Sequence, residues 1–135
     1  MSMICVVAAN EVYFFNESFG EVKHAKFVHG TNIKVFRYCE ELGLFYLCGD
    51  EKYITILTLV KATDSFLIKT FDIQSKYEVS TFDVFPTVGT IVAVDKNYDV
   101  RLFDIVQGTC YQLANYSNIV KKQNGEIKML KISKS

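Results

Sequence analysis

The chain has 135 residues, half of them hydrophobic, and its 15 acidic and 15 basic side chains leave no formal net charge. This length supports about one domain with a buried core, and the composition excludes an intrinsically disordered chain. The neutral balance argues against bulk binding to nucleic acid or an anionic membrane, and no apolar run approaches the ~18 residues of a membrane span.

Short alternating runs of β-branched and aromatic residues, separated by polar turns, recur along the whole chain. No segment keeps a helical period over the ~11 residues that would identify an amphipathic helix. The sequence therefore predicts an all-β fold, and Asn124-Gly125 is typical of a hairpin turn. The predicted strands cover residues 4–9, 12–16, 21–28, 33–39, 44–48, 53–59, 66–73, 79–85, 90–94, 100–105, 109–114, 119–123 and 126–132.

A strand, a polar turn and a second strand recur three times, with Val12, Ile54 and Val100 in equivalent places. Their spacings of 42 and 46 residues are typical of four-stranded propeller blades. This period divides a β domain, residues 1–116, into blade-like repeats at about 4–28, 32–73 and 79–114, followed by a basic hairpin or tail, 117–135. About four to eight blades close a ring, and three are predicted here. We therefore expect either that the chain belongs to a longer propeller or that a protein partner or self-association completes the sheet or propeller.

The stretch DKNYDVRLFD, residues 95–104, resembles the end of a WD repeat, with Phe103 in place of the usual Trp. The Gly-His pair that opens such repeats is absent. The resemblance implies a partial propeller of antiparallel four-stranded blades, in which the Asp104 carboxylate accepts turn hydrogen bonds. A closed β-barrel or a sandwich is the alternative for so many short strands.

The same stretch is similar to an Asp-Lys-x-Gly-Asp-Val sequence in the WD-repeat subunit of eukaryotic tRNA guanine-N7 methyltransferase. Asp95, Lys96, Asp99 and Val100 match, and Tyr98 replaces the glycine. In that family the propeller stabilises the catalytic partner and does not bind the methyl donor. The resemblance implies a scaffold in an RNA-modification complex, with the basic tail or loops near tRNA.

Sequence patterns of catalytic chemistry are missing: there is no nucleophile elbow, phosphate loop or Cys-x-x-Cys pair. We therefore expect no enzyme, no catalytic or cofactor-binding residues, no metal site and no cofactor. His24 and His29 are expected to be surface-strand and loop residues, and the acid pairs 40–41 and 50–51 to be solvated. A cysteine enzyme would need a low-pKa thiol beside one of the histidines.

The four cysteines are interpreted as reduced core residues of an intracellular protein, cytoplasmic or nuclear. They are Cys5, Cys39, Cys48 and Cys110.

The expected function is protein–protein interaction by a non-catalytic scaffold, with a small-ligand-binding β-barrel as the alternative. Aromatic residues at turns and strand ends are typical contact residues, which selects Tyr53, Phe85 and Tyr98. In the tail, Lys121, Lys122 and Lys128 would contact phosphate or an acidic partner, or would only protect an edge strand.

Overall fold

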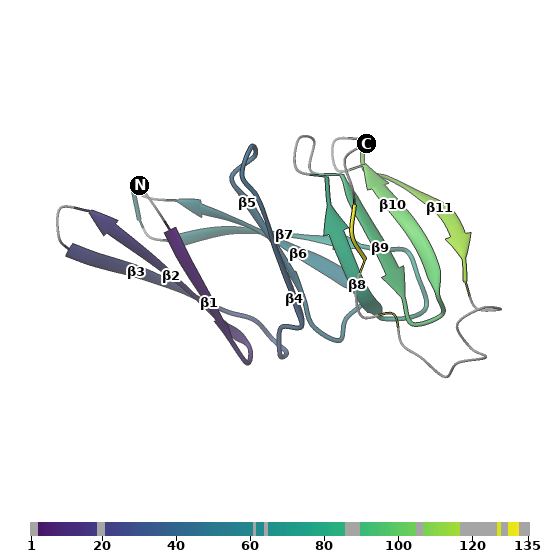
Figure 1. Cartoon of the computed structure of the whole chain (residues 1–135), viewed down its shortest axis with the longest axis horizontal. Helices are drawn as coiled ribbons and strands as arrows, with labels where there is room; N and C mark the ends of the chain where they lie inside the picture. Colours follow the sequence, from purple (N-terminus) through teal and green to yellow (C-terminus); the bar gives the residue numbers. More distant parts are fainter. Residues whose placement is uncertain are drawn as a thin grey trace.

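The computed structural model of the chain, shown in Figure 1, describes residues 3–18, 21–60, 62–63, 65–85, 90–104, 107–116, 127 and 130–132. The described residues contain strands and no helix, which confirms the all-β prediction. The strands are β1 (Met3–Ala8), β2 (Glu11–Ser18), β3 (Glu21–Val28), β4 (Val35–Cys39), β5 (Leu44–Cys48), β6 (Tyr53–Val60), β7 (Ser65–Asp72), β8 (Val79–Val84), β9 (Ile91–Asp95), β10 (Asp99–Asp104) and β11 (Thr109–Asn115).

The strands form three antiparallel sheets in which consecutive strands are neighbours. Sheet 1 has the order β1-β2-β3, sheet 2 the order β4-β5-β6-β7, and sheet 3 the order β8-β9-β10-β11. Sheets of three and four meandering strands are compatible with propeller-like blades. Each sheet is open at both edges, so the described residues do not form the closed barrel that was the alternative.

The eleven observed strands match predicted ones, two with identical bounds and nine with ends within two residues. Predicted strand 119–123 and the Asn124-Gly125 turn lie outside the described residues. The prediction of a strand at 126–132 is wrong for the described residues 127 and 130–132, which lie in no strand. Ile127, Leu130 and Ile132 instead pack with their side chains against the surface of sheet 3.

The inner strands of sheet 2, β5 and most of β6, are buried on both surfaces because the sheet lies between the other two sheets (Figure 1). Along β5, Phe45 and Leu47 pack toward sheet 1, while Tyr46 and Cys48 pack toward sheet 3. A strand buried on both faces needs an apolar residue at nearly every position, and Leu44–Cys48 reads LFYLC. The interface with sheet 1 is aromatic, since the rings of Phe14 and Phe45 meet edge to face with centroids 4.8 Å apart.

The first strands of sheets 2 and 3 lie beside each other. Arg37 of β4 forms an ion pair with the buried Asp83 of β8, with 3.7 Å between Nε and Oδ1. The other carboxylate oxygen of Asp83 accepts a hydrogen bond from the Ile132 N–H at 2.8 Å. Asp83 therefore connects β4 with the segment that packs on the far surface of sheet 3.

The four cysteines form no disulfide bond, and their burial follows the predicted core role only in part. Cys39 and Cys48 are fully buried, whereas Cys5 and Cys110 are half-buried.

Candidate protein-interaction surface

One end of the stack is formed by the β1–β2, β5–β6 and β9–β10 turns together with the segments that connect the sheets. Backbone hydrogen bonds join these pieces. The His29 N–H donates to Asn10 O at 2.7 Å, Val79 N–H to Glu51 O at 2.7 Å, and Lys96 N–H to Glu78 O at 2.9 Å. We call this end of the stack the turn end.

A buried histidine–glutamate pair fixes the turn end of sheet 2. His29 Nε2 lies 2.5 Å from Glu51 Oε1, and both side chains are 6% exposed. The Gly49 N–H donates to the same carboxylate at 2.8 Å, and the Tyr53 hydroxyl also hydrogen-bonds Glu51. Burial by itself would raise the pKa of Glu51, but these hydrogen bonds together lower it below its usual value. The prediction that Glu51 is solvated is therefore wrong, because its carboxylate is buried against His29 inside the turn end. His29 lies in the loop after β3, as predicted, but its side chain is buried.

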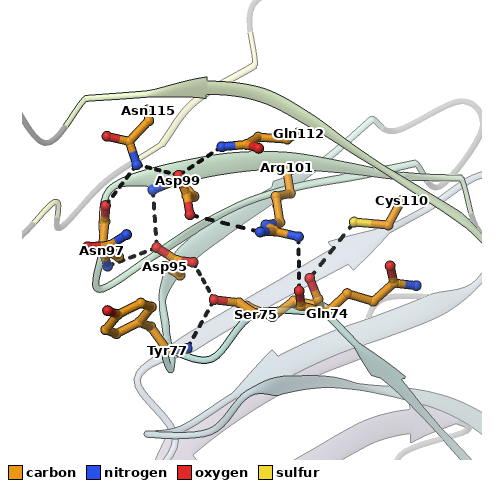
Figure 2. A network of polar contacts seen from close by, with 11 residues as sticks. Gln74, Ser75, Tyr77, Asp95, Asn97, Asp99, Arg101, Cys110, Gln112 and Asn115 are labelled. Carbon is orange, nitrogen blue, oxygen red and sulfur yellow. Dashed lines mark hydrogen bonds and ion pairs between the residues drawn. The ribbon is translucent and has the colours of Figure 1, made fainter.

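Asp95 plays the corresponding part in sheet 3, as Figure 2 shows. Its carboxylate is 1% exposed and accepts hydrogen bonds from the N–H groups of Asn97 (2.8 Å) and Asp99 (3.1 Å). It also accepts a hydrogen bond from the hydroxyl of Ser75, which lies in the segment between β7 and β8. In sheets 2 and 3, an acid at the turn between the second and third strands thus binds the segment that precedes the first strand. Glu51 binds His29 before β4, and Asp95 binds Ser75 before β8.

A second layer of polar contacts surrounds Asp95 and joins sheet 3 to the end of sheet 2 (Figure 2). Arg101 donates to Gln74 O at 2.9 Å, and the Cys110 thiol lies 3.8 Å from Ile73 O. Gln112 and Asn115 both donate to Asp99. The turn end is consequently held by side chains as well as by the backbone.

Four tyrosines lie on this hydrogen-bonded frame. Tyr53 begins β6, Tyr77 precedes β8, Tyr98 lies in the β9–β10 turn, and Tyr116 follows β11. Tyr53, Tyr77 and Tyr116 are 38%, 46% and 44% exposed, and Tyr98 is half-buried. The Tyr116 N–H donates to Tyr98 O at 2.9 Å, which links the last two. We call Tyr53, Tyr77, Tyr98 and Tyr116 the tyrosine set.

The charges beside the tyrosine set are of both signs. Lys96 pairs with Glu78 at 3.0 Å and with Asp50 at 3.6 Å, and Lys34 pairs with Asp50 at 3.3 Å. The hydrogen bond from Lys34 lowers the pKa of Asp50, and the charge of Lys96 adds to this effect. This balance fits a polar protein surface better than a phosphate backbone, which needs an excess of cations.

The residues predicted as contacts fall in three places. Tyr53 and Tyr98 both lie at the turn end, Tyr53 in sheet 2 and Tyr98 in sheet 3. Phe85 lies at the opposite end of sheet 3, where it is half-buried and packs with the apolar cluster around Val92. Lys121, Lys122 and Lys128 lie outside the described residues.

Sequence reasoning missed Tyr77, Tyr116 and the two acids that fix the turns. The signal for Asp95 was present, because an aspartate followed by polar residues in a short turn is typical of side-chain capping of backbone N–H groups. No signal paired His29 with Glu51, since they are 22 residues apart and meet only through the fold.

Burial raises the pKa of Cys48 to about 12, the opposite of what a thiolate nucleophile requires. Among the described residues, no three His, Cys, Asp or Glu side chains gather in a way that could hold a metal ion. The same residues include no helix that could cross a membrane.

No protein-family model matches the chain, and no curated protein matches its sequence.

Proposed function

We propose that this chain is a non-catalytic, propeller-type scaffold that binds another protein through the turn end. The observation that carries the proposal is the tyrosine set on a frame of buried hydrogen bonds. Tyrosine contributes a large contact area for two rotatable bonds, and interface hot spots are enriched in it. A rigid frame lowers the entropy that such a surface loses on binding.

The acids and the histidine at the turn end support a structural part for these groups. Glu51 and His29 bind each other, and Asp95 is surrounded by the three donors described above. Groups engaged in this way hold the loops that carry the tyrosines, which is what a binding surface requires.

A finer version of the proposal places the scaffold in a tRNA methyltransferase complex. It rests on the resemblance at Asp95, Lys96, Asp99 and Val100. Asp95 accepts hydrogen bonds within the turn, Asp99 accepts them from side chains of β11, and Val100 is buried, so the fold alone accounts for three of the four. Lys96 is 41% exposed and is the matched residue best placed to meet a partner.

The test is affinity capture of the tagged chain from the cells that express it, followed by measurement of the affinity for the captured protein. The variant combines Tyr53→Ala, Tyr77→Ala and Tyr98→Gly. Tyr98 has φ +65°, so glycine removes its side chain without backbone strain. We expect binding to weaken at least tenfold.

The matched control is Tyr38→Ala, because Tyr38 is 52% exposed but lies near the β4–β5 turn at the opposite end. It should change the affinity less than twofold. Equal losses in both variants, or a wild-type chain that retains no protein in stoichiometric amount, would overturn the proposal. A captured methyltransferase together with bound tRNA would support the finer version, and a captured protein of another class would reject it.

A further inference from the structure

The three sheets repeat one another residue by residue, and this repetition identifies their corresponding faces. With Val12, Ile54 and Val100 aligned, the paired strands align Ile4 with Phe45 and Ile91, and Val6 with Leu47 and Ala93. We call the surface of a sheet that carries these residues its front and the opposite surface its back. In sheets 2 and 3 the front packs against the back of the preceding sheet.

The front of sheet 1 carries exposed apolar residues beside a polar cluster of Glu11, Tyr13 and Lys26. Its Ile4 and Val6 are 63% and 46% exposed, whereas the equivalent residues of sheets 2 and 3 are at most 4% exposed. Phe15, which pairs with Ile4 on the same face, aligns with the buried Leu57 and Phe103 and is half-buried. Exposed apolar residues at positions that are core in two sister sheets indicate a face built for a neighbouring sheet.

The other end of the stack is the back of sheet 3, and it is apolar too. Leu102 is half-buried there, although the equivalent residues Phe14 and Ile56 are core residues of the two internal interfaces. Tyr111, which pairs with Leu102 on the same face, is 52% exposed. The stack thus ends in a front at sheet 1 and a back at sheet 3, the two surfaces that pack together twice within the chain.

Ile127, Leu130 and Ile132 pack on the back of sheet 3. In the two internal interfaces, the first strand of the following sheet packs on the back of the preceding sheet in the same way. Phe36 of β4 packs on the back of sheet 1, and Phe82 of β8 on the back of sheet 2. β4 and β8 each pair with the following strand of their own sheet, β5 and β9. In sheet 1 the strand equivalent to β5 and β9 is β1. It pairs with β2 on one side and has no other neighbour among the described strands.

We propose that two copies of this chain associate head to tail, with the back of sheet 3 in each copy covering the front of sheet 1 in the other. Two copies together contain six sheets, and about four to eight blades close a propeller. Contacts between two different surfaces form a closed ring or an open filament according to the rotation between units. This inference uses neither the turn end nor an external partner, so it stands or falls separately from the proposed function.

The test is the molar mass of the purified chain by light scattering over a hundredfold concentration range. Wild type should give twice the 15.4 kDa chain mass. Ile4→Asp, on the front of sheet 1, and Tyr111→Asp, on the back of sheet 3, should each give the mass of one chain. Both residues are exposed within the single chain, so these variants should keep the wild-type circular dichroism spectrum.

Leu67→Asp is the matched control, because Leu67 is 65% exposed on β7 and belongs to neither end of the stack. It should remain a two-chain assembly. Mixing Ile4→Asp with Tyr111→Asp should restore a two-chain assembly of lower affinity than wild type, since one of its two contacts then joins an intact front to an intact back. A wild-type monomer, an open polymer, or an assembly that survives either end variant would overturn the proposal, as would a failure of the mixture to associate.

Discussion

The imidazole of His29 and the carboxylate of Glu51 are in direct contact in a buried site, with 2.5 Å between Nε2 and Oε1. This contact joins the segment before β4 to the β5–β6 turn. Its strength depends on an ionised carboxylate, because an acceptor-only group is what the Gly49 N–H and the Tyr53 hydroxyl need as partners. Four consequences of this and related contacts can be measured.

The first concerns pH. The pKa of Glu51 is lower in the folded chain than its ordinary value of 4.5, so its stabilisation is fully present above that value. It is lost as the pH falls through the folded pKa. Glu51→Gln should lower the free energy of unfolding by about 2 kcal/mol at pH 7, and this difference should shrink below about pH 4.5. Urea unfolding between pH 3 and 7 measures it.

Asp50→Asn is the control for Glu51→Gln, because Asp50 is 68% exposed and its ion pairs with Lys34 and Lys96 are at the surface. It should change stability little at any pH in this range. A difference between wild type and Glu51→Gln that stays constant down to pH 3 would contradict an ionised Glu51.

The second prediction concerns Asp95. Asp95→Ala should cost about 3 kcal/mol of unfolding free energy, because it leaves two backbone N–H groups and the Ser75 hydroxyl without their buried acceptor. Asp95→Asn should cost less, since the amide oxygen still accepts. Asp104 provides a comparison: it accepts the expected turn hydrogen bond from the Gln107 N–H at 3.1 Å, but at an exposed turn. Thermal unfolding of Asp104→Ala should show a smaller loss, and an equal loss would refute this ranking.

The third prediction concerns Tyr46. Its hydroxyl is buried and has no hydrogen-bond partner among the described residues. Tyr46→Phe should therefore raise the free energy of unfolding by about 1 kcal/mol. Burial also raises the pKa of Tyr46 to about 12, so wild type should lose stability as the pH rises from about 10 to 12.

Denaturant unfolding of the two proteins at pH 7 and pH 11 tests both statements about Tyr46. The advantage of Tyr46→Phe should be larger at pH 11, because phenylalanine has no proton to lose. Stability that falls in Tyr46→Phe at pH 7 would show that the hydroxyl has a partner.

The fourth prediction concerns a close approach at Gly49. A Cβ atom there would overlap the Thr31 side chain and the Asn32 carbonyl oxygen. Gly49→Ala should cost about 2–3 kcal/mol or more, since the obstacle includes backbone. Gly30→Ala has open space around it and should be nearly neutral by the same denaturant titration. Similar stabilities for the two variants would mean that residues 31–32 move away readily.

The fold class could be read from local patterns. The alternation of apolar and polar residues predicted the eleven observed strands, and the recurrence of Val12, Ile54 and Val100 marks equivalent positions of the three sheets. Both signals are local because a strand's period and its turn residues depend on neighbours in the chain. Tyr53, Tyr98 and Phe85 were selected by the same local rule, from their places at turns and strand ends. Their role as contact residues stays a prediction, and Phe85 packs against sheet 3.

Only the tertiary structure decided which residues meet across the sheets. His29 and Glu51 look like solvated loop residues in the sequence, and they become a buried pair because the segment before β4 crosses the β5–β6 turn. Ile4 and Phe45 are equally apolar in the sequence, yet one is exposed and the other buried, since the front of sheet 2 packs on sheet 1 while no described strand covers the front of sheet 1. Alternation determines that a residue points to one side of a sheet, and the packing of the sheets determines whether anything covers that side.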